Sequence, residues 1–334
     1  MLSFESFSGS LDDWWNILAQ LPDREVFQTP AWIRFIAESQ KATPVIATLK
    51  DGGTAVGYFA GLTVKKAGFK ILGSPFIGWG TERMGLRLLP GVSKPHAVEA
   101  ITRYAFGELK CSHFEFGDAA IAPDDVAGLG FSCKSTATPV VDLTADEDAI
   151  YSRMSSKSCR YCIRKAEKLG VIIEEAKDDA FADEYCDQMR DVFAKQRLVP
   201  TYGVDRVRLL MKHLLPTGNL LLLRARESEG RCIATGIFLG MHETAFFWGN
   251  SSWRADQHFC PNESLHWYAM RYWKRRGAKS YDFCGGGEYK RKYGGVEKEL
   301  YHFTKSKYRW LSVGRNMALK SFRMYQRIAG WQKK

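Results

Sequence analysis

The pattern of apolar and polar positions in the first part of the chain predicts three strands, then a helix and a fourth strand. The apolar runs are short, and an Asp-Gly-Gly turn at 51–53 separates the first two. Helical spacing replaces strand spacing before the last run. The predicted elements are strands over 43–49, 55–64 and 69–76, a helix over 95–109 and a strand over 113–116.

The second half of the chain repeats this order. The strand endings are also similar, because Phe-Glu-Phe-Gly at 114–117 and Tyr-Asp-Phe-Cys-Gly at 281–285 each follow a predicted helix. We therefore expect two α+β domains of one plan, each with a mixed sheet flanked by helices. The predicted elements are strands over 220–225, 232–239 and 244–248, a helix over 261–276 that opens with proline, and a strand over 280–283.

A basic amphipathic helix is predicted between the two halves. Thr144-x-x-Glu147 is a capping box that opens it, and Gly170 ends it before a strand over 171–174. Positively charged side chains share one face, which is either a surface for RNA or a nucleotide or a solvated face. The basic positions are Arg153, Lys157, Arg160, Arg164 and Lys168, and the opposite, core-facing positions are Ile150, Met154, Tyr161 and Leu169. We take Arg160 and Arg164 as candidate substrate-binding residues.

The domain boundary is placed at Leu143, which gives an N-terminal domain over 1–143 and a C-terminal domain over 144–304. The remaining segment, 305–334, predicts a second basic amphipathic helix that packs on the domains. Contact of this helix with an anionic membrane is the alternative. Its apolar positions include Trp310, Val313, Met317, Phe322, Tyr325 and Ile328.

Composition and charge narrow the class of protein. A chain of 334 residues is long enough for two domains, and a net charge of +11 favours an anionic partner such as tRNA, a nucleotide or an acidic membrane surface. The N-terminus has no secretory signal pattern, so we expect a cytoplasmic protein, at most peripheral at the inner face of the membrane. Eight dispersed cysteines indicate reduced thiols, and we predict no metal site despite the close pair Cys159 and Cys162.

The segment 281–295 is the most unusual stretch, because a strand runs into three glycines and then into a basic aromatic run. Glycines let backbone amides approach a ligand, and a following lysine can neutralise a phosphate or an oxyanion. It lacks the P-loop pattern. A flexible turn with solvated lysines is the alternative. We take Lys290 as a candidate catalytic residue, and Gly285 and Tyr289 as candidate substrate-binding residues.

Two predicted strand ends supply further candidates. Asp118 could act as a general base, with an ordinary loop aspartate as the alternative. Trp248, Asn250 and Ser251 could form a ligand-binding edge, although packing would explain the tryptophan equally well.

Four stretches in order resemble the Fem-like acyltransferases, the family of the peptidoglycan-bridge aminoacyltransferases and related acetyltransferase-like proteins. They are Phe-Gln-Thr-Pro-Ala-Trp at 27–32, Arg-Tyr-Cys-Ile-Arg-Lys-Ala-Glu-Lys-Leu-Gly-Val at 160–171, 261–268 together with 281–285, and Tyr-Lys-Arg-Lys-Tyr-Gly at 289–294. The resemblance implies two tandem domains of the acetyltransferase (GNAT) fold and transfer of an acyl group from an activated carrier to an amine. It also implies that Lys290 lies close to the reacting centre and that Trp32 contributes to substrate binding.

The resemblance leaves the donor open between an acyl thioester such as acyl-CoA and aminoacyl-tRNA, either of them a co-substrate and not a bound cofactor. The residues at 251–261 contain no glycine, which speaks against the usual acyl-CoA pyrophosphate turn. The expected acceptor is an amine of a cell-envelope precursor or of a polysaccharide sugar. A non-catalytic protein that binds RNA or a membrane surface is the alternative function. The oligomeric state stays open.

Overall fold

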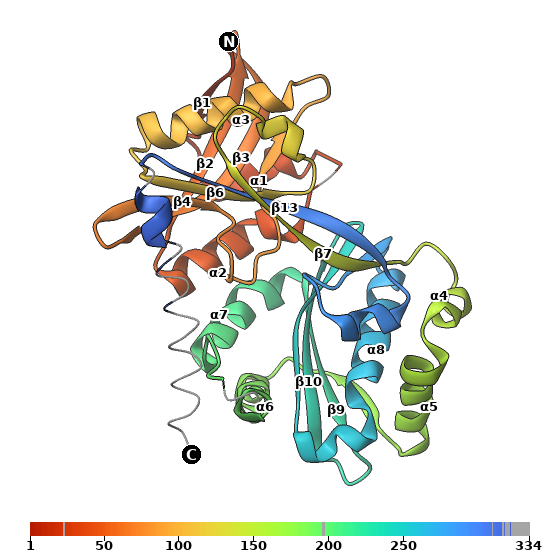
Figure 1. The fold of residues 1–334 in the computed structure, drawn as a ribbon. Helices are drawn as coiled ribbons and strands as arrows, with labels where there is room; N and C mark the ends of the chain where they lie inside the picture. The colour runs from red at the N-terminus through yellow and green to blue at the C-terminus, as the bar shows by residue number, and fades with distance from the viewer. Residues whose placement is uncertain (23, 196–197, 309, 316, 318–320, 322–334) are drawn as a thin grey trace. The chain divides into compact units, whose positions relative to one another are not determined.

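The computed structural model describes residues 1–334 except 23, 196–197, 309, 316, 318–320 and 322–334 (Figure 1). The chain divides into two compact units. Unit 1 comprises Met1–Ala137 together with Glu299–Ala318, and unit 2 comprises Thr138–Lys298. The boundaries predicted from the sequence, after 143 and after 304, each fall slightly later in the chain than these divisions.

Unit 1 is built on a mixed sheet in which every neighbouring pair is antiparallel except β4 and β6. A parallel pair needs a crossover, and the helix α3 (Lys94–Arg103) lies in the connection between these two strands. A short strand, β5 (Leu86–Leu88), pairs with β3 at the side of this path. The strand order is β1 (Ser3–Ser6), β2 (Thr43–Asp51), β3 (Thr54–Lys66), β4 (Phe69–Ser74), β6 (His113–Asp118) and β13 (Val296–Ser306).

Local sequence explains the helices of unit 1. Ser10 and Asp13 form a capping box, and Thr29 caps a helix whose first residue is Pro30. The helix predicted over 95–109 is one α-helix followed by a π-helical turn. The elements are α1 (Leu11–Leu18), η1 (Val26–Gln28), α2 (Pro30–Gln40), α3, the π-turn η2 (Tyr104–Glu108) and η3 (Pro123–Val126).

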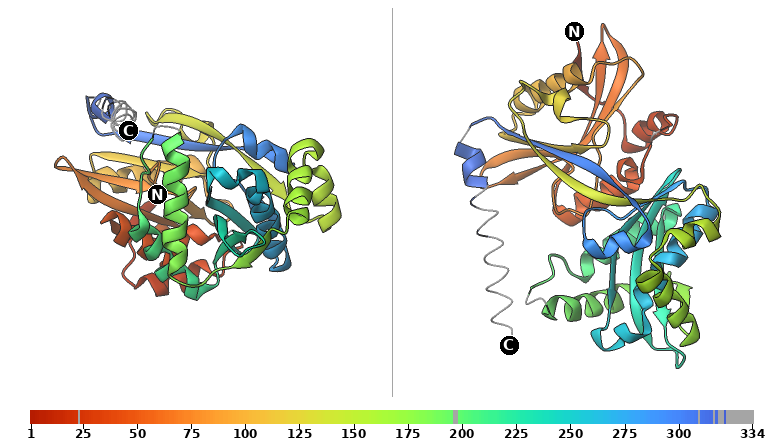
Figure 2. Two further views of the ribbon diagram at one scale, coloured as in Figure 1. Left: turned by 90° about the horizontal axis from the view of Figure 1, so that it is seen from below. Right: turned by 45° about the vertical axis from the view of Figure 1, so that its right-hand side comes forward.

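Unit 2 repeats the plan of unit 1. Its sheet is antiparallel except for the parallel pair β11 and β12, which is joined through α8 (Pro261–Arg275). The helices α8 and α6 (Ala180–Lys195) cover opposite faces of this sheet (Figures 1 and 2). The strand order is β8 (Ile172–Glu175), β9 (Leu220–Arg226), β10 (Cys232–Met241), β11 (Thr244–Ser252), β12 (Ser280–Asp282) and β7 (Ser132–Asp142).

The last strand of each sheet comes from the other half of the sequence. β7 follows β6 in the chain, yet its residues 140–142 pair with β12 in unit 2. β13 follows β12, yet its residues 301–306 pair with β6 in unit 1. The repeated order predicted from the sequence is therefore present, with its closing strands exchanged.

The helix predicted after Thr144 is wrong in two respects. Asp146, not Thr144, caps it, because the Asp146 side chain accepts from the Ala149 amide. The helix then stops at Met154, whose extended backbone separates α4 (Glu147–Arg153) from the π-turn η4 (Ser156–Arg160) and α5 (Tyr161–Lys168). The predicted basic stripe is therefore not one face of one helix. Ile150 and Met154 are buried as predicted, whereas Tyr161 and Leu169 are exposed.

Two further helical elements complete unit 2 before its central strands. They are α7 (Val204–Leu214) and the short η5 (Leu215–Thr217). Later in the chain, the short helices η6 (Arg254–Phe259) and η7 (Glu288–Tyr293) precede α8 and follow β12, respectively. Each unit has its own buried core, one around Phe59, Phe114 and Phe303 and the other around Phe238, Phe247 and Phe283. None of the described helices is long and apolar enough to cross a membrane.

Candidate active site

The strands β11 and β12 separate in the middle of the unit 2 sheet. β12 pairs only with residues 244–246 of β11 and ends at Asp282, whereas β11 continues to Ser252. From Phe247 onward, the edge of β11 that faces β12 is thus no longer paired with that strand. Backbone N–H and C=O groups at such an edge can bind an extended ligand.

A β-bulge in β11 lies at the same point. Ile237 of β10 is opposite Gly249, and Phe238 is opposite Phe247, so Trp248 is an extra residue in the ladder. Because of this extra residue, the side chains of β11 after Trp248 point to the opposite face of the sheet from the one that regular alternation would give them. Phe247 packs in the core beneath α8, whereas a Cβ added to Gly249 would lie 2.4 Å from the Tyr185 hydroxyl of α6.

The α6 side of the bulge carries a cluster of aromatic and polar side chains. The hydroxyls of Tyr185 and Tyr202 are 2.9 Å apart, and the ring of Tyr202 lies 5.4 Å from that of Trp248. The guanidinium of Arg206 stands over both of these rings, at 5.3 and 6.0 Å from their centroids. Burial raises the pKa of Tyr185 well above its ordinary value, while the nearby Ser251 acts in the opposite direction.

Sequence reasoning found Trp248 and Ser251 but missed Tyr185, Tyr202 and Arg206. These three residues precede Trp248 by more than forty positions, on α6, α7 and the connection between them. No motif marks them, because only the packing of α6 and α7 brings them to the bulge. Asn250 points to the other side, where its amide donates to Asn262 of α8 at 3.0 Å.

The glycine-rich segment after β12 is held in a defined loop. The carboxylate of Asp282 accepts from the Cys284 amide at 2.8 Å and from the Thr138 hydroxyl at 2.7 Å. Cys284 and Gly285 then adopt left-handed backbone conformations, which turn the chain sharply away from the strand.

Lys290 closes this loop. Its ammonium donates to three backbone carbonyls, those of Phe283 at 2.8 Å, Cys284 at 3.2 Å and Gly285 at 2.9 Å. The side chain is only 7% exposed and also lies over the Phe247 ring at 5.5 Å. Lys290 therefore fixes the end of β12 next to the point where β11 and β12 separate, and its N–H donors are engaged there. Tyr289, in contrast, is half exposed.

The N-terminus of α8 is acidic. Glu263 lies in its first turn, nearly buried, and forms an ion pair with Lys292 of η7. Cys260 and Pro261 precede it, and no glycine stands between Ser251 and Pro261. A pyrophosphate bound at this terminus would meet the Glu263 carboxylate and would lack a glycine turn for its oxygens.

His266, on α8, is buried in unit 2. Its Nδ1 lies 2.8 Å from the Tyr281 hydroxyl, and its Nε2 has no hydrogen-bond partner among the described residues. Burial lowers the pKa of His266 well below 6.5, and the nearby lysines 292 and 290 act in the same direction. The imidazole is therefore neutral.

Asp118 and Trp32, the candidates from unit 1, are both buried. Asp118 accepts from the amides of Leu86 at 2.7 Å and Ala120 at 2.8 Å, and Arg87 lies 3.9 Å away. It thus caps the turn after β6 much as Asp282 caps the turn after β12. Burial raises the pKa of Asp118, while Arg87 opposes this shift. Trp32 is fully buried and donates to Thr81 at 3.0 Å. These contacts are structural, and a role for either residue in the reaction stays a prediction.

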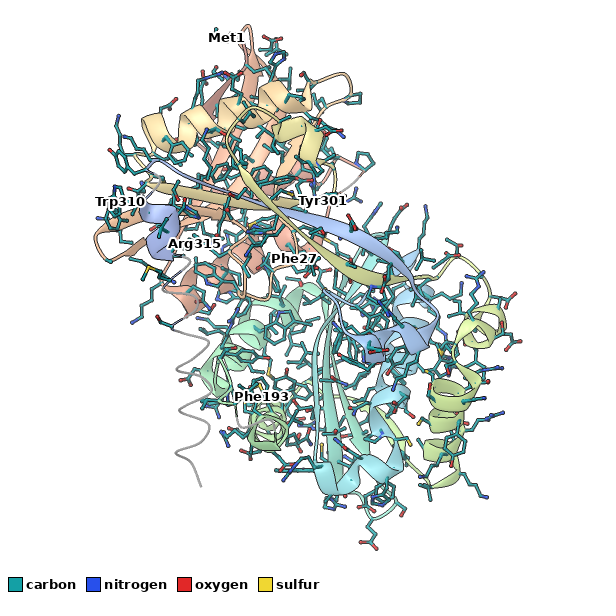
Figure 3. The ribbon with its side chains drawn as sticks, in the orientation of Figure 1. Met1, Phe27, Phe193, Tyr301, Trp310 and Arg315 are labelled. Atoms are coloured by element: carbon teal, nitrogen blue, oxygen red, sulfur yellow. The ribbon has the colours of Figure 1, made fainter. Side chains whose placement is uncertain are left out.

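The basic candidates lie on η4 and α5. Arg164 is exposed, and Arg160 is half buried, with its Nε buried and without a hydrogen-bond partner among the described residues. The predicted C-terminal helix lies mostly outside the described residues. In its described part, Arg315 pairs with the buried Glu115 of β6, and Trp310 packs on Phe69 at 5.6 Å (Figure 3).

Comparison with known proteins identifies the fold of this site. Residues 153–292 match the family model described as an acetyltransferase (GNAT) domain. This part of unit 2 is therefore similar to a GNAT acetyltransferase domain. The matched residues include α5, β11, α8 and the Lys290 loop, so the separated strands belong to the matched region.

The whole chain is also similar in fold to solved structures, one of which is a tandem GNAT protein. It is similar to FemX, with a TM-score of 0.70, 13% identity, and coverage of 89% of this chain and 96% of that one. It is similar to L-PGS from Bacillus licheniformis, with a TM-score of 0.54, 11% identity, and coverage of 87% of this chain and 95% of that one. It is also similar to a tandem GNAT protein from the clavulanic acid biosynthesis pathway, with a TM-score of 0.54, 12% identity, and coverage of 92% of this chain and 98% of that one. No curated protein sequence matches the chain.

These likenesses confirm the predicted α+β fold of two tandem GNAT-like units, and the family model supports the acyltransferase class. At such low identities the solved structures establish the fold alone. The roles of the individual site residues stay predictions.

Proposed function

We propose that this GNAT protein transfers an aminoacyl or acyl group to an amine, and that the reacting carbonyl lies where β11 and β12 separate. The observation that carries the proposal is the edge of β11 after Phe247, which leaves β12 beside the bulge at Trp248. An acyl group extended along this edge would be held by backbone groups at fixed positions. Its carbonyl would approach the amides at the bulge, which can stabilise the negative charge that develops as the amine attacks.

Lys290 supports this arrangement as a positioning residue. Because its ammonium is bonded to three carbonyls, it fixes the loop that borders the opening and adds positive charge beside it. Direct bonding of Lys290 to an oxyanion would require the ammonium to leave at least one of these carbonyls. The aromatic cluster at Trp248 offers a surface for the acyl group or for a base of the carrier.

Aminoacyl-tRNA is the donor that we favour over acyl-CoA. The N-terminus of α8 lacks a glycine turn for a pyrophosphate, whereas the net charge of +11 and the exposed Arg164 suit an RNA backbone. The resemblance to the peptidoglycan-bridge aminoacyltransferases supports the same donor and an acceptor amine on a cell-envelope precursor. An amine of a polysaccharide sugar is the second acceptor class.

The test is to incubate the purified full chain with labelled aminoacyl-tRNA or labelled acyl-CoA and an amine acceptor pool. We expect consumption of aminoacyl-tRNA above its spontaneous hydrolysis and transfer of label to an amine product. Consumption of acyl-CoA alone would overturn the donor assignment. Consumption of neither carrier, together with salt-sensitive RNA or vesicle binding, would favour the non-catalytic alternative.

A binding measurement tests the tRNA assignment independently of turnover. In Arg160→Gln/Arg164→Gln, tRNA binding should weaken, and the slope of log Kd against log salt should fall by about one for each lost phosphate contact. The exposed Arg103→Gln in α3 of unit 1 is the matched charge control. Equal slopes in all three proteins would contradict RNA binding by η4 and α5.

A further inference from the structure

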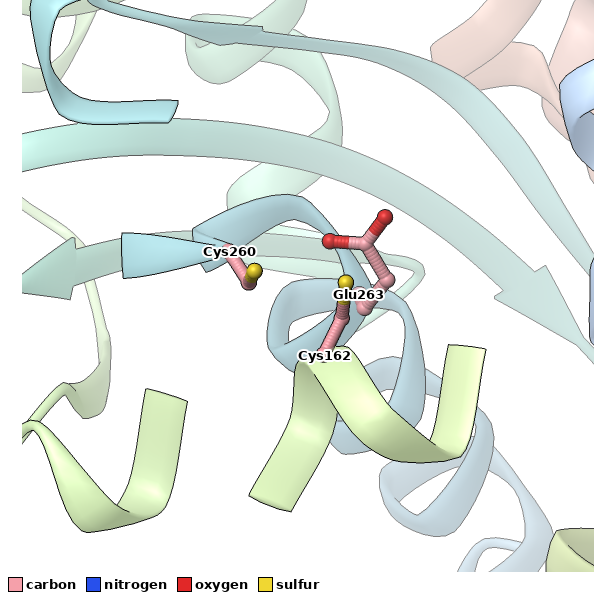
Figure 4. A group of neighbouring side chains, drawn as sticks. All are labelled: Cys162, Cys260 and Glu263. Carbon is pink, nitrogen blue, oxygen red and sulfur yellow. The ribbon is translucent and has the colours of Figure 1, made fainter. Parts of the chain in front are cut away.

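Cys162, Cys260 and Glu263 bring two thiols and a carboxylate together at the beginning of α8. The ligand atoms of the three side chains lie within 4.8 Å of one another. Cys162 belongs to α5, while Cys260 caps α8 and Glu263 lies in its first turn. Figure 4 shows both sulfur atoms and the carboxylate directed into one space. The cluster thus joins two elements that are far apart in the sequence.

The spacing of these atoms is close to that of a tetrahedral metal site. With bonds of about 2.3 Å to sulfur and about 2.0 Å to oxygen, the ligand atoms around a zinc ion are roughly 3.5–3.8 Å apart. In the structure, no two of these three ligand atoms are more than 4.8 Å apart. Small rotations of the side chains would therefore bring all three ligand atoms to bonding distance without movement of the helices.

The charges around the cluster also fit a divalent ion. Two thiolates and one carboxylate would leave a single excess negative charge around the ion, and Lys292 already pairs with Glu263. Glu263 and Lys292 have side chains that are only 11% and 23% exposed, so an unbalanced charge would be costly there. With the ion bound, Lys292 would balance the excess.

We propose that Cys162, Cys260 and Glu263 bind one divalent ion of the zinc type, with water as the fourth ligand. Thiolate ligands select a borderline-soft ion over magnesium or calcium. Binding would form two metal–sulfur bonds and one metal–oxygen bond, and the two thiol protons would pass to solvent. The ion would link α5 to α8 and, through Lys292, to η7, which carries Lys290. The ion would hold these elements together, and the test of the site requires no acyl donor.

The experiment loads the full chain, purified with a reductant and stripped with a chelator, with one equivalent of Zn²⁺ or Co²⁺. We expect one zinc per chain by mass spectrometry of the metal, a raised Tm, and a Co²⁺ spectrum with sulfur-to-metal charge transfer and intense tetrahedral bands. Cys162→Ser and Cys260→Ser should each lose the bound equivalent and the charge-transfer band. Lys292→Met should weaken binding by about tenfold or more while keeping the band.

Cys133→Ser is the matched control, because Cys133 is an exposed cysteine on β7. It should bind zinc like the unaltered chain. Circular dichroism and the Tm of each stripped variant show whether it is folded. Failure of the folded chain to retain zinc would overturn the proposal, as would a charge-transfer band that persists in Cys260→Ser.

Discussion

Lys290 shows how a single charged side chain can hold the end of a strand and the loop that follows it. Replacing it with methionine leaves three carbonyls, one buried and two partly buried, without their donor, and we expect the free energy of unfolding to fall by about 1–3 kcal/mol. We expect acyl transfer to fall with it, because the loop that borders β11 would lose its fixed position. Urea unfolding and steady-state kinetics measure the two effects.

The relative sizes of the loss of stability and the loss of acyl transfer distinguish a positioning role of Lys290 from direct catalysis. A residue that acts only on the oxyanion would lower kcat while leaving the stability and KM unchanged. Normal stability of Lys290→Met together with a large loss of kcat would therefore contradict the positioning role. The neighbouring Lys292 is not a suitable control, since it pairs with Glu263.

The pKa of His302 allows a prediction of how the stability of unit 1 changes at low pH. Burial lowers its pKa from 6.5 to about 4, although Glu115 acts in the opposite direction. Between these values the unfolded chain binds a proton that the folded chain does not, so the free energy of unfolding falls as the pH drops from 6.5 to 4. The free energy of unfolding that is lost over this pH range amounts to roughly 3 kcal/mol.

His302→Gln should reduce this loss. The measurement is urea unfolding of both proteins at pH 7, 5.5 and 4. The stability of the variant should still depend on pH to some extent, because the pKa of His266 is also lowered. An identical pH dependence in both proteins would show that His302 does not cause it.

At the scale of elements, the bulge in β11 decides which side chains reach the site. Gly249→Ala would place a Cβ 2.4 Å from the Tyr185 hydroxyl, which is bonded to Tyr202. Because Tyr185 is buried, we expect a loss of about 1–3 kcal/mol in stability and a raised KM for the acyl donor.

Gly203→Ala is the matched control for this substitution. A Cβ at Gly203 meets no atom within 4 Å, and its backbone is extended. Because Gly203 is the N-cap of α7, where alanine caps less well, we expect a loss of about 1 kcal/mol or less and an unchanged KM. If both substitutions left KM unchanged, the cluster at Trp248 would not contact the donor.

At the scale of the whole molecule, each sheet depends on a strand from the other half of the sequence. Phe303 of β13 is fully buried in the core of unit 1, beside Phe116 at 5.0 Å. Phe303→Ala should destabilise unit 1 by about 3–5 kcal/mol. Hydrogen exchange should locate the loss in β6 and its neighbours.

Val296→Ala, on the same strand, is the control, because Val296 is 71% exposed. Its cost should be small. The exchange of strands also predicts that residues 1–137 expressed alone will be poorly folded, since β6 would then lack β13. A stable fragment with native circular dichroism would contradict this prediction.

The sequence by itself determined the central elements of each half and their repeated order, but it missed α6, α7 and the closing strands β7 and β13. Strands 43–49 and 220–225 and the helix from Pro261 follow from local periodicity and from the positions of glycine and proline, which act over a few residues. The same local information located Trp248 and the Lys290 loop. It failed at Met154, where one extended residue breaks the predicted basic helix.

Only the tertiary structure decided which elements meet. Pairing of β7 with β12 and of β13 with β6 depends on contacts across more than a hundred residues, which periodicity does not encode. Tyr185 beside Gly249 and Cys162 beside Cys260 likewise come from elements that are far apart in the sequence. Local pattern fixes how each segment folds, whereas packing of distant apolar faces fixes the neighbours and hence the chemistry of the site.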